Sequence, residues 1–153
     1  MAADAGLKLR AADQEDLAVI SACLQDALVS VRDLAYDPDA RTFMFVANRF
    51  RWEGGRPGGA DVEPGFERVH CAVVFDEVDQ ATYRGFRRSE EDRILSLLAI
   101  RSRPASRGTA IDLIFAAGGA IRLGTTALQC RLRDCGEPWP TVWYPDHPLD
   151  EHP

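Results

Sequence analysis

The sequence predicts an α+β fold, in which one N-terminal amphipathic helix is followed by a mostly antiparallel sheet of seven or eight strands that curls toward a barrel. Three observations support this prediction. Apolar residues recur at helical spacing in residues 14–27, they alternate with polar residues over most of the later chain, and turn sequences separate the alternating segments. At 153 residues, the chain is expected to form a single globular domain over 1–153, with 137–153 as a tail rich in proline and tryptophan.

The first elements are a short strand and the helix. Leu7 and Leu9 alternate with charged residues, as in a strand with one buried face. Asp13 is suited to cap the helix over residues 14–27, because its carboxylate can accept a hydrogen bond from a backbone N–H of the first turn. The residues at helical spacing are Leu17, Ile20, Leu24, Ala27 and Leu28.

Residues 42–52 are predicted to form a long strand that ends in the sequence NRFRW. Successive residues of a strand point to opposite faces. We therefore expect the two rings, Phe50 and Trp52, on the apolar face and the two arginines, Arg49 and Arg51, in solvent. This separation argues against a platform for single-stranded nucleic acid, which needs rings and cations on one surface.

The later strands are separated by turn sequences. Residues 53–65 contain five glycines and two prolines and are expected to connect two strands of a hairpin. Residues 126–135 fit either a strand or a capped helix, and the alternation favours a strand. The tail contains five prolines and is not expected to continue the interior of a sheet. The remaining strands are predicted at 69–75, 78–84, 94–100, 111–115 and 121–123.

The composition indicates a cytoplasmic protein that does not enter a membrane. No apolar run approaches the roughly 20 residues of a membrane helix, and the N-terminus lacks the apolar segment of a secretion signal. The cysteines are scattered through apolar segments, which favours reduced core thiols over a disulfide scaffold. They are Cys23, Cys71, Cys130 and Cys135.

The net charge of −6 is unevenly distributed. Residues 1–40 carry −5, residues 41–133 carry +4 and residues 134–153 carry −5. Binding to duplex nucleic acid is not expected of an acidic chain, since that affinity depends on neutralising phosphates.

Several segments together resemble an uncharacterised proteobacterial family known only as a domain of unknown function. The resemblance covers roughly residues 7 to 148, nearly the whole chain. It implies a stand-alone cytosolic protein of about this length and supplies no activity, cofactor or catalytic residue. The segments that carry it are LKLRAADQEDLAVISACLQDALV, FVANRFRWE, RVHCAVVFD, LSLLAI, GGAIRL and GEPWPT.

Residues 84–107 contain seven arginines and three acids and are the candidate surface for an anion or an acidic partner. The alternative is that these arginines are solvated loop charges paired with the neighbouring acids. They fall on either side of the strand at 94–100, which rises about 23 Å, so we expect them at opposite ends of it. The candidates are Arg84, Arg87, Arg88, Arg101, Arg103 and Arg107.

The tail places Trp139, Trp143 and Tyr144 among prolines. Such a segment either docks into a groove of a partner protein or folds back over its own sheet, where burial of the rings stabilises the domain. The sequence leaves both possibilities open.

We expect no catalytic, cofactor-binding or metal-binding residues. Cys71 adjoins His70, but neighbouring strand residues face opposite ways, so a buried structural thiol is the better interpretation. Cys130 and Cys135 are too far apart for a CxxC motif, and the glycines near residue 55 lack the ending of a phosphate loop.

The function that best fits the sequence is a non-enzymatic binding or assembly protein of the cytoplasm, with an arginine-rich edge for a protein partner. The second hypothesis is a small-ligand or anion-binding domain with a pocket inside the curled sheet. The third is an enzyme whose residues come from distant strands, since catalytic groups are arranged by geometry and not by order. The sequence does not indicate the oligomeric state.

Overall fold

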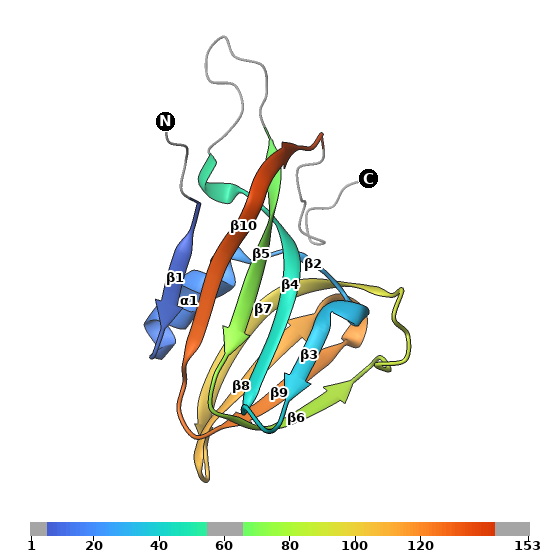
Figure 1. Cartoon of the computed structure of the whole chain (residues 1–153). Coiled ribbons are helices and arrows are strands. Elements are labelled where there is room, and N and C mark those ends of the chain that lie inside the picture. Colours follow the sequence, from blue (N-terminus) through green and yellow to red (C-terminus); the bar gives the residue numbers. More distant parts are fainter. Residues whose placement is uncertain (1–5, 55–65, 143–153) are drawn as a thin grey trace.

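The computed structural model of the chain describes residues 6–54 and 66–142 (Figure 1). Within these residues it contains one α-helix, α1 (Gln14–Cys23), and three short 3-10 helices, η1 (Val31–Asp33), η2 (Trp52–Gly54) and η3 (Ala116–Gly118). The strands are β1 (Lys8–Ala11), β2 (Leu28–Ser30), β3 (Leu34–Asp37), β4 (Thr42–Phe50), β5 (Glu67–Phe75), β6 (Val78–Arg84), β7 (Ile94–Ala105), β8 (Gly108–Phe115), β9 (Ala120–Thr125) and β10 (Cys130–Pro140).

All strands pair antiparallel in one ten-stranded sheet, ordered β1-β10-β5-β4-β2-β7-β8-β9-β6, with β3 also paired to β4. The short strand β2 joins two halves of this path. It pairs with β4 at one register position, Leu28 opposite Asn48, and with β7 at three positions. We call β1, β10, β5, β4 and β3 the first half and β7, β8, β9 and β6 the second half.

The α+β class and the mostly antiparallel sheet are confirmed, whereas the predicted barrel is wrong. The sheet is not strongly curled, and in the described part of the chain it stays open, with β1 and β6 as its end strands. It has ten strands instead of seven or eight, partly because the 3-10 turn Val31–Asp33 divides residues 28–37 into β2 and β3.

The helix begins where the sequence predicts and ends earlier. Asp13 caps it, since its Oδ1 accepts a hydrogen bond of 2.9 Å from the Asp16 backbone N–H. The predicted helix ran to residue 27, but Asp26 has φ +65° and donates its N–H to the Leu97 carbonyl oxygen at 2.7 Å. The chain leaves the helix because residues 26 and 27 pair with β7.

Side chains of α1 also satisfy the backbone of β7 beyond the end of β2. Ser21 Oγ accepts from the Ile100 N–H at 2.9 Å, and Gln14 Nε2 donates to the Ser102 carbonyl oxygen at 2.8 Å. An uncovered strand edge presents unpaired backbone groups, so the helix here protects β7. Leu17 and Ile20 of α1 are buried in the core.

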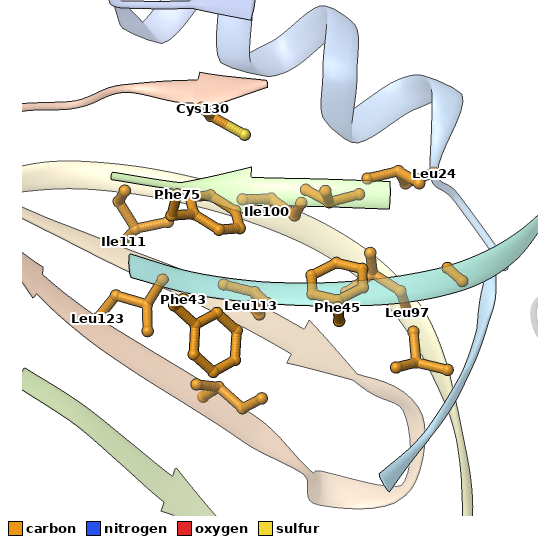
Figure 2. Close-up of a cluster of buried hydrophobic side chains, with 14 of the residues drawn as sticks. Leu24, Phe43, Phe45, Phe75, Leu97, Ile100, Ile111, Leu113, Leu123 and Cys130 are labelled. Atoms are coloured by element: carbon orange, nitrogen blue, oxygen red, sulfur yellow. The ribbon is translucent and has the colours of Figure 1, made fainter. Parts of the chain in front are cut away.

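One hydrophobic core contains side chains from both halves of the sheet and from α1. Figure 2 shows Phe43 and Phe45 of β4 and Phe75 of β5 close to Leu113 of β8 and Leu123 of β9. The halves cross at an angle (Figure 1), and their facing sides supply this cluster. Their outer sides therefore point away from the core in opposite directions.

The beginning of the tail continues the sheet as an edge, and not in the interior that the prediction excluded. After an irregularity following Cys135, β10 pairs with β5 again through Trp139 and Pro140, and the Thr141 N–H donates to the Phe66 carbonyl oxygen at 2.9 Å. Proline is compatible with this position because the pairing of β10 with β1 ends at Arg133, which leaves the rest of β10 as an edge. The predicted strand at 126–135 is confirmed from Cys130 on, whereas residues 126–129 precede β10.

No helix in the described ranges is both long and apolar enough to cross a membrane.

Candidate functional site

The stretch NRFRW has the opposite orientation to the one predicted. Arg49 is 0% exposed and faces the inner side of β4 with Phe43, Phe45 and Ala47. Phe50 lies on the other side, where its ring packs against Trp52 at 4.7 Å and Phe66 at 5.7 Å between centroids. The expectation that the core-facing side carries the rings and that Arg49 lies in solvent is therefore wrong, because the odd-numbered face of β4 meets the core. Phe50 is nevertheless buried, on the opposite face.

Arg49 is held by acceptors that use its whole guanidinium group. Nε and Nη2 donate to the two carboxylate oxygens of Asp134 at 2.9 and 2.7 Å. Nη1 and Nη2 donate to the two oxygens of Glu53 at 2.9 and 2.6 Å, and Nη1 also donates to the Phe50 carbonyl oxygen at 3.2 Å. A guanidinium has five N–H donors. All of them are used inside the protein, so Arg49 joins β4, η2 and β10 and has no donor left for a ligand.

Charges alternate outward from this buried arginine. Arg51 contacts Glu53 at 3.7 Å and Glu67 at 2.5 Å, so the chain of ion pairs runs from Asp134 to the start of β5. Burial raises the pKa of Glu53. The hydrogen bonds from Arg49, a backbone hydrogen bond and the charges of Arg49 and Arg51 together outweigh burial, so the pKa lies below its ordinary value. The network links β4, η2, β5 and β10 at one end of the first half.

The prediction of reduced thiols in the core is confirmed for Cys71 and Cys130, and only in part for Cys23. Cys71 and Cys130 are buried, and burial raises the pKa of each thiol to about 12. Cys23 is half-buried and Cys135 is exposed, so the thiols are not all in the core. His70 is exposed on the face of β5 opposite to the buried Cys71, which leaves the thiol without a neighbouring base from this pair.

Three of the predicted arginines share the outer face of the second half. The strand β7 continues to Ala105, so Arg101 and Arg103 lie within it and not beyond its end. Arg101 pairs in register with Asp112 of β8, which pairs with Arg122 of β9, while Arg84 ends the neighbouring strand β6. We call this surface, with Arg84, Arg101, Arg103 and Arg122, the arginine face.

The arginine face contains a shallow concavity of about 370 Å³. Arg84, Arg103 and Arg122 line it together with Asp112, and small residues of β8 and β9 form its floor: Ala110, Ala120 and Gly124. The expectation that Arg84 and Arg103 lie at opposite ends of a strand is wrong, because the order of β7, β8, β9 and β6 brings them to one hollow.

One carboxylate serves this face. Asp112 accepts from Arg122 Nε at 2.8 Å and from Arg103 Nε at 3.4 Å. Arg84 and Arg101 form no ion pair with the residues that the structure describes. Four guanidinium groups around one carboxylate leave an excess of positive charge, in a chain whose overall charge is −6.

The other predicted arginines lie away from the concavity. Arg87 and Arg88 belong to the connection between β6 and β7, where Arg88 Cζ lies 5.2 Å from the centroid of the Tyr83 ring. Arg107 is exposed in the turn between β7 and β8. The sequence analysis missed Arg122. The available signal is its alternation with the apolar residues 121 and 123, which indicates a side chain on the outward face of the strand.

Of the aromatic tail residues, the structure places Trp139 alone, since Trp143 and Tyr144 lie outside the described residues. Trp139 is half-buried, and its ring centroid lies 4.7 Å from that of His70 on β5. This contact lies on the protein's own sheet. Whether the whole tail folds back over this sheet or docks into a partner stays a prediction.

Comparison with known proteins identifies a family for almost the whole chain. The family model described as "Protein of unknown function (DUF2948)" matches residues 7–147. No curated protein and no solved structure matches the chain.

Proposed function

Because the chain belongs to DUF2948, a family of unknown function, we propose a function from its surface: it is a non-enzymatic binding protein whose arginine face binds an acidic segment of a partner protein. The observation that carries this proposal is the group of four arginines on one exposed sheet face, where Arg103 and Arg122 share the carboxylate of Asp112. Guanidinium groups donate in a planar fork that matches carboxylates.

The spacing of the arginines favours an extended partner over a single small ion. From β7 to β6 the face spans three strand spacings, about 14 Å. One carboxylate cannot contact groups at both sides of such a surface, whereas a segment with several acidic side chains can lie across the strands. The small residues Ala110, Ala120 and Gly124 leave room for its backbone.

A cytoplasmic location is part of the proposal. All four cysteines are free thiols, including the exposed Cys135. Free thiols are typical of a reducing compartment.

A small anion is the second candidate, and the concavity of about 370 Å³ favours it. In this case Arg84, Arg103 and Arg122 would hold one phosphate or carboxylate group over the floor of small residues. The sequence suggested a pocket inside a curled sheet. The concavity instead lies on the outer face of the sheet.

The test is the affinity of a short fluorescein-labelled peptide of alternating Glu and Thr, measured by fluorescence anisotropy. We expect the double variant Arg84→Glu/Arg103→Glu to lose binding and the affinity of the natural chain to fall as salt rises. The matched control is Arg32→Glu/Arg41→Glu, which makes the same change in net charge at exposed arginines of other elements. The control should bind like the natural chain.

The results separate the two candidates. Equal losses in both double variants, or an affinity that does not change with salt, would contradict the role of the arginine face. Inorganic phosphate that raises the melting temperature, together with no binding of the peptide, would favour the small-anion function, because a ligand that binds the native state stabilises it.

A further inference from the structure

A second group of cations lies on the outer face of the first half. Lys8 and Arg10 of β1 and Arg131 and Arg133 of β10 are all exposed. Lys8 pairs in register with Arg133, and Arg10 pairs with Arg131, so the four cations form two cross-strand pairs next to each other. We call these four residues the β1–β10 cation block.

This arrangement is unfavourable for the sheet itself. Side chains directly opposite each other on neighbouring strands lie about 5 Å apart at Cβ, and like charges there are destabilising. Along each strand the two cations are two residues apart, about 6.7 Å. Among the described residues one carboxylate pairs with the block: Asp76, 3.0 Å from Arg131 Nη2. Four cations are thus concentrated in a small area with one anion beside them.

The block borders a large concavity with an apolar floor. The concavity has a volume of about 770 Å³ and is lined by the four cations, by Ala72 and Val74 of β5, and by Leu9 and Leu132. On β4, next to β5, Met44 and Val46 are 38% and 37% exposed. A ligand in this hollow therefore meets positive charge on one side and an exposed apolar strip on the other.

We propose that the β1–β10 cation block binds the oligophosphate group of a small molecule. A chain of phosphates carries several negative charges in a compact volume, so it can contact four cations whose Cβ atoms lie within about 8 Å of each other. Arginine forks and a lysine ammonium are both suited to phosphate oxygens. The apolar strip of Ala72 and Val74 then contacts the organic part of the molecule.

This site is independent of the arginine face. The two surfaces lie on opposite sides of the common core, and no residue belongs to both. The chemistry also differs, since the arginines of the second half are spread over four strands and the block is confined to two. A failure of either proposal leaves the other intact.

The experiment is titration of the full chain with sodium tripolyphosphate by isothermal titration calorimetry at constant ionic strength. We expect saturable binding, which weakens about tenfold or more in the variant Arg131→Glu/Arg133→Glu. Arg133→Glu and Arg131→Glu place opposite charges across from Lys8 and Arg10, which offsets the lost ion pair between Arg131 and Asp76. The melting temperature of the free variant is measured as well, and an unchanged value shows that lost binding is not due to unfolding.

Other outcomes overturn the inference. If Arg84→Glu/Arg103→Glu weakens the binding of tripolyphosphate and the block variant does not, the phosphate belongs to the arginine face. Equal weakening in the control Arg32→Glu/Arg41→Glu would show that binding follows net charge. Binding to vesicles that contain anionic phospholipid, with no binding of tripolyphosphate, would assign the surface to a membrane instead.

Discussion

Replacing Arg49 by methionine tests the interpretation of the buried ion network. Methionine fills a similar space without charge. The Asp134 side chain is 5% exposed, and after the replacement it keeps one described hydrogen bond, from the Leu7 N–H at 2.9 Å. Removing one partner of a buried ion pair destabilises a protein by about 3–5 kcal/mol. For a domain of this length that corresponds to a fall in melting temperature of about 6–20 °C.

The double variant Arg49→Met/Asp134→Leu should recover most of this loss. Replacing both partners of a buried pair with apolar residues is often neutral, because no uncompensated charge stays inside. Glu53 is 35% exposed and can turn to water when Arg49 is absent. The free energies of unfolding would be measured in urea by tryptophan fluorescence, and the melting temperatures by calorimetry.

The control is Arg122→Met, which removes an arginine that is 54% exposed in its ion pair with Asp112. Surface pairs contribute about 0–1 kcal/mol, so this variant should unfold close to the natural chain. The reasoning would be refuted by a loss below about 1 kcal/mol in Arg49→Met. It would also be refuted by a double variant whose loss is the sum of the two single losses, since that would show no coupling between the charges.

The same network predicts a dependence on pH. The pKa of Glu53 lies below its ordinary value of 4.5 in the folded chain, so the unfolded chain binds the proton more readily. Glu53 therefore stabilises the fold above about pH 4.5, and this contribution is lost as the pH falls through the lower, folded pKa. In Arg49→Met the contribution should be smaller, because the backbone hydrogen bond and the charge of Arg51 are the lowering causes that stay. An identical acid-induced loss in both proteins would contradict this assignment.

Three further predictions concern other parts of the fold. At pH 8, iodoacetamide should modify the exposed Cys135 and not Cys71, whose pKa of about 12 keeps it a thiol; mass spectrometry would detect any equal modification that contradicts this. Gly108→Ala should destabilise more than Gly136→Ala in urea unfolding, since both positions have positive φ but a Cβ at Gly108 also overlaps the Thr125 carbonyl and one at Gly136 meets nothing within 4 Å. Trp139→Ala should lower the free energy of unfolding by about 1 kcal/mol through loss of its ring contact with β5, and an unchanged value would show that this ring does not stabilise the sheet.

Most of the secondary structure could be predicted from the sequence because the local signals agree with the fold. The cap at Asp13 and the alternation in β5 and β9 each have one physical explanation, and the structure contains both. The order of the strands in the sheet could not be read in the same way, since pairing such as β2 with both β4 and β7 depends on contacts between distant residues.

The orientation of β4 was not predictable from its own residues. Both faces carry apolar side chains, with Met44 and Val46 on one and Phe43 and Phe45 on the other, so alternation alone does not show which face is buried. A signal existed elsewhere: Asp134 follows the buried Leu132 at a spacing of two in β10, which places an acid on an inward face. An inward acid requires an inward cation, and Arg49 is that cation.

The pairing of β1 with β10 has a consequence for how the chain folds. Lys8 lies opposite Arg133, so β1 has no partner in the sheet until residues 130–133 of β10 have left the ribosome. Until then β1 has no paired strand, and the edge of β5 that later pairs with β10 is open to other nascent chains. Contacts between such distant residues slow folding, which makes the protein dependent on β10 for protection against aggregation.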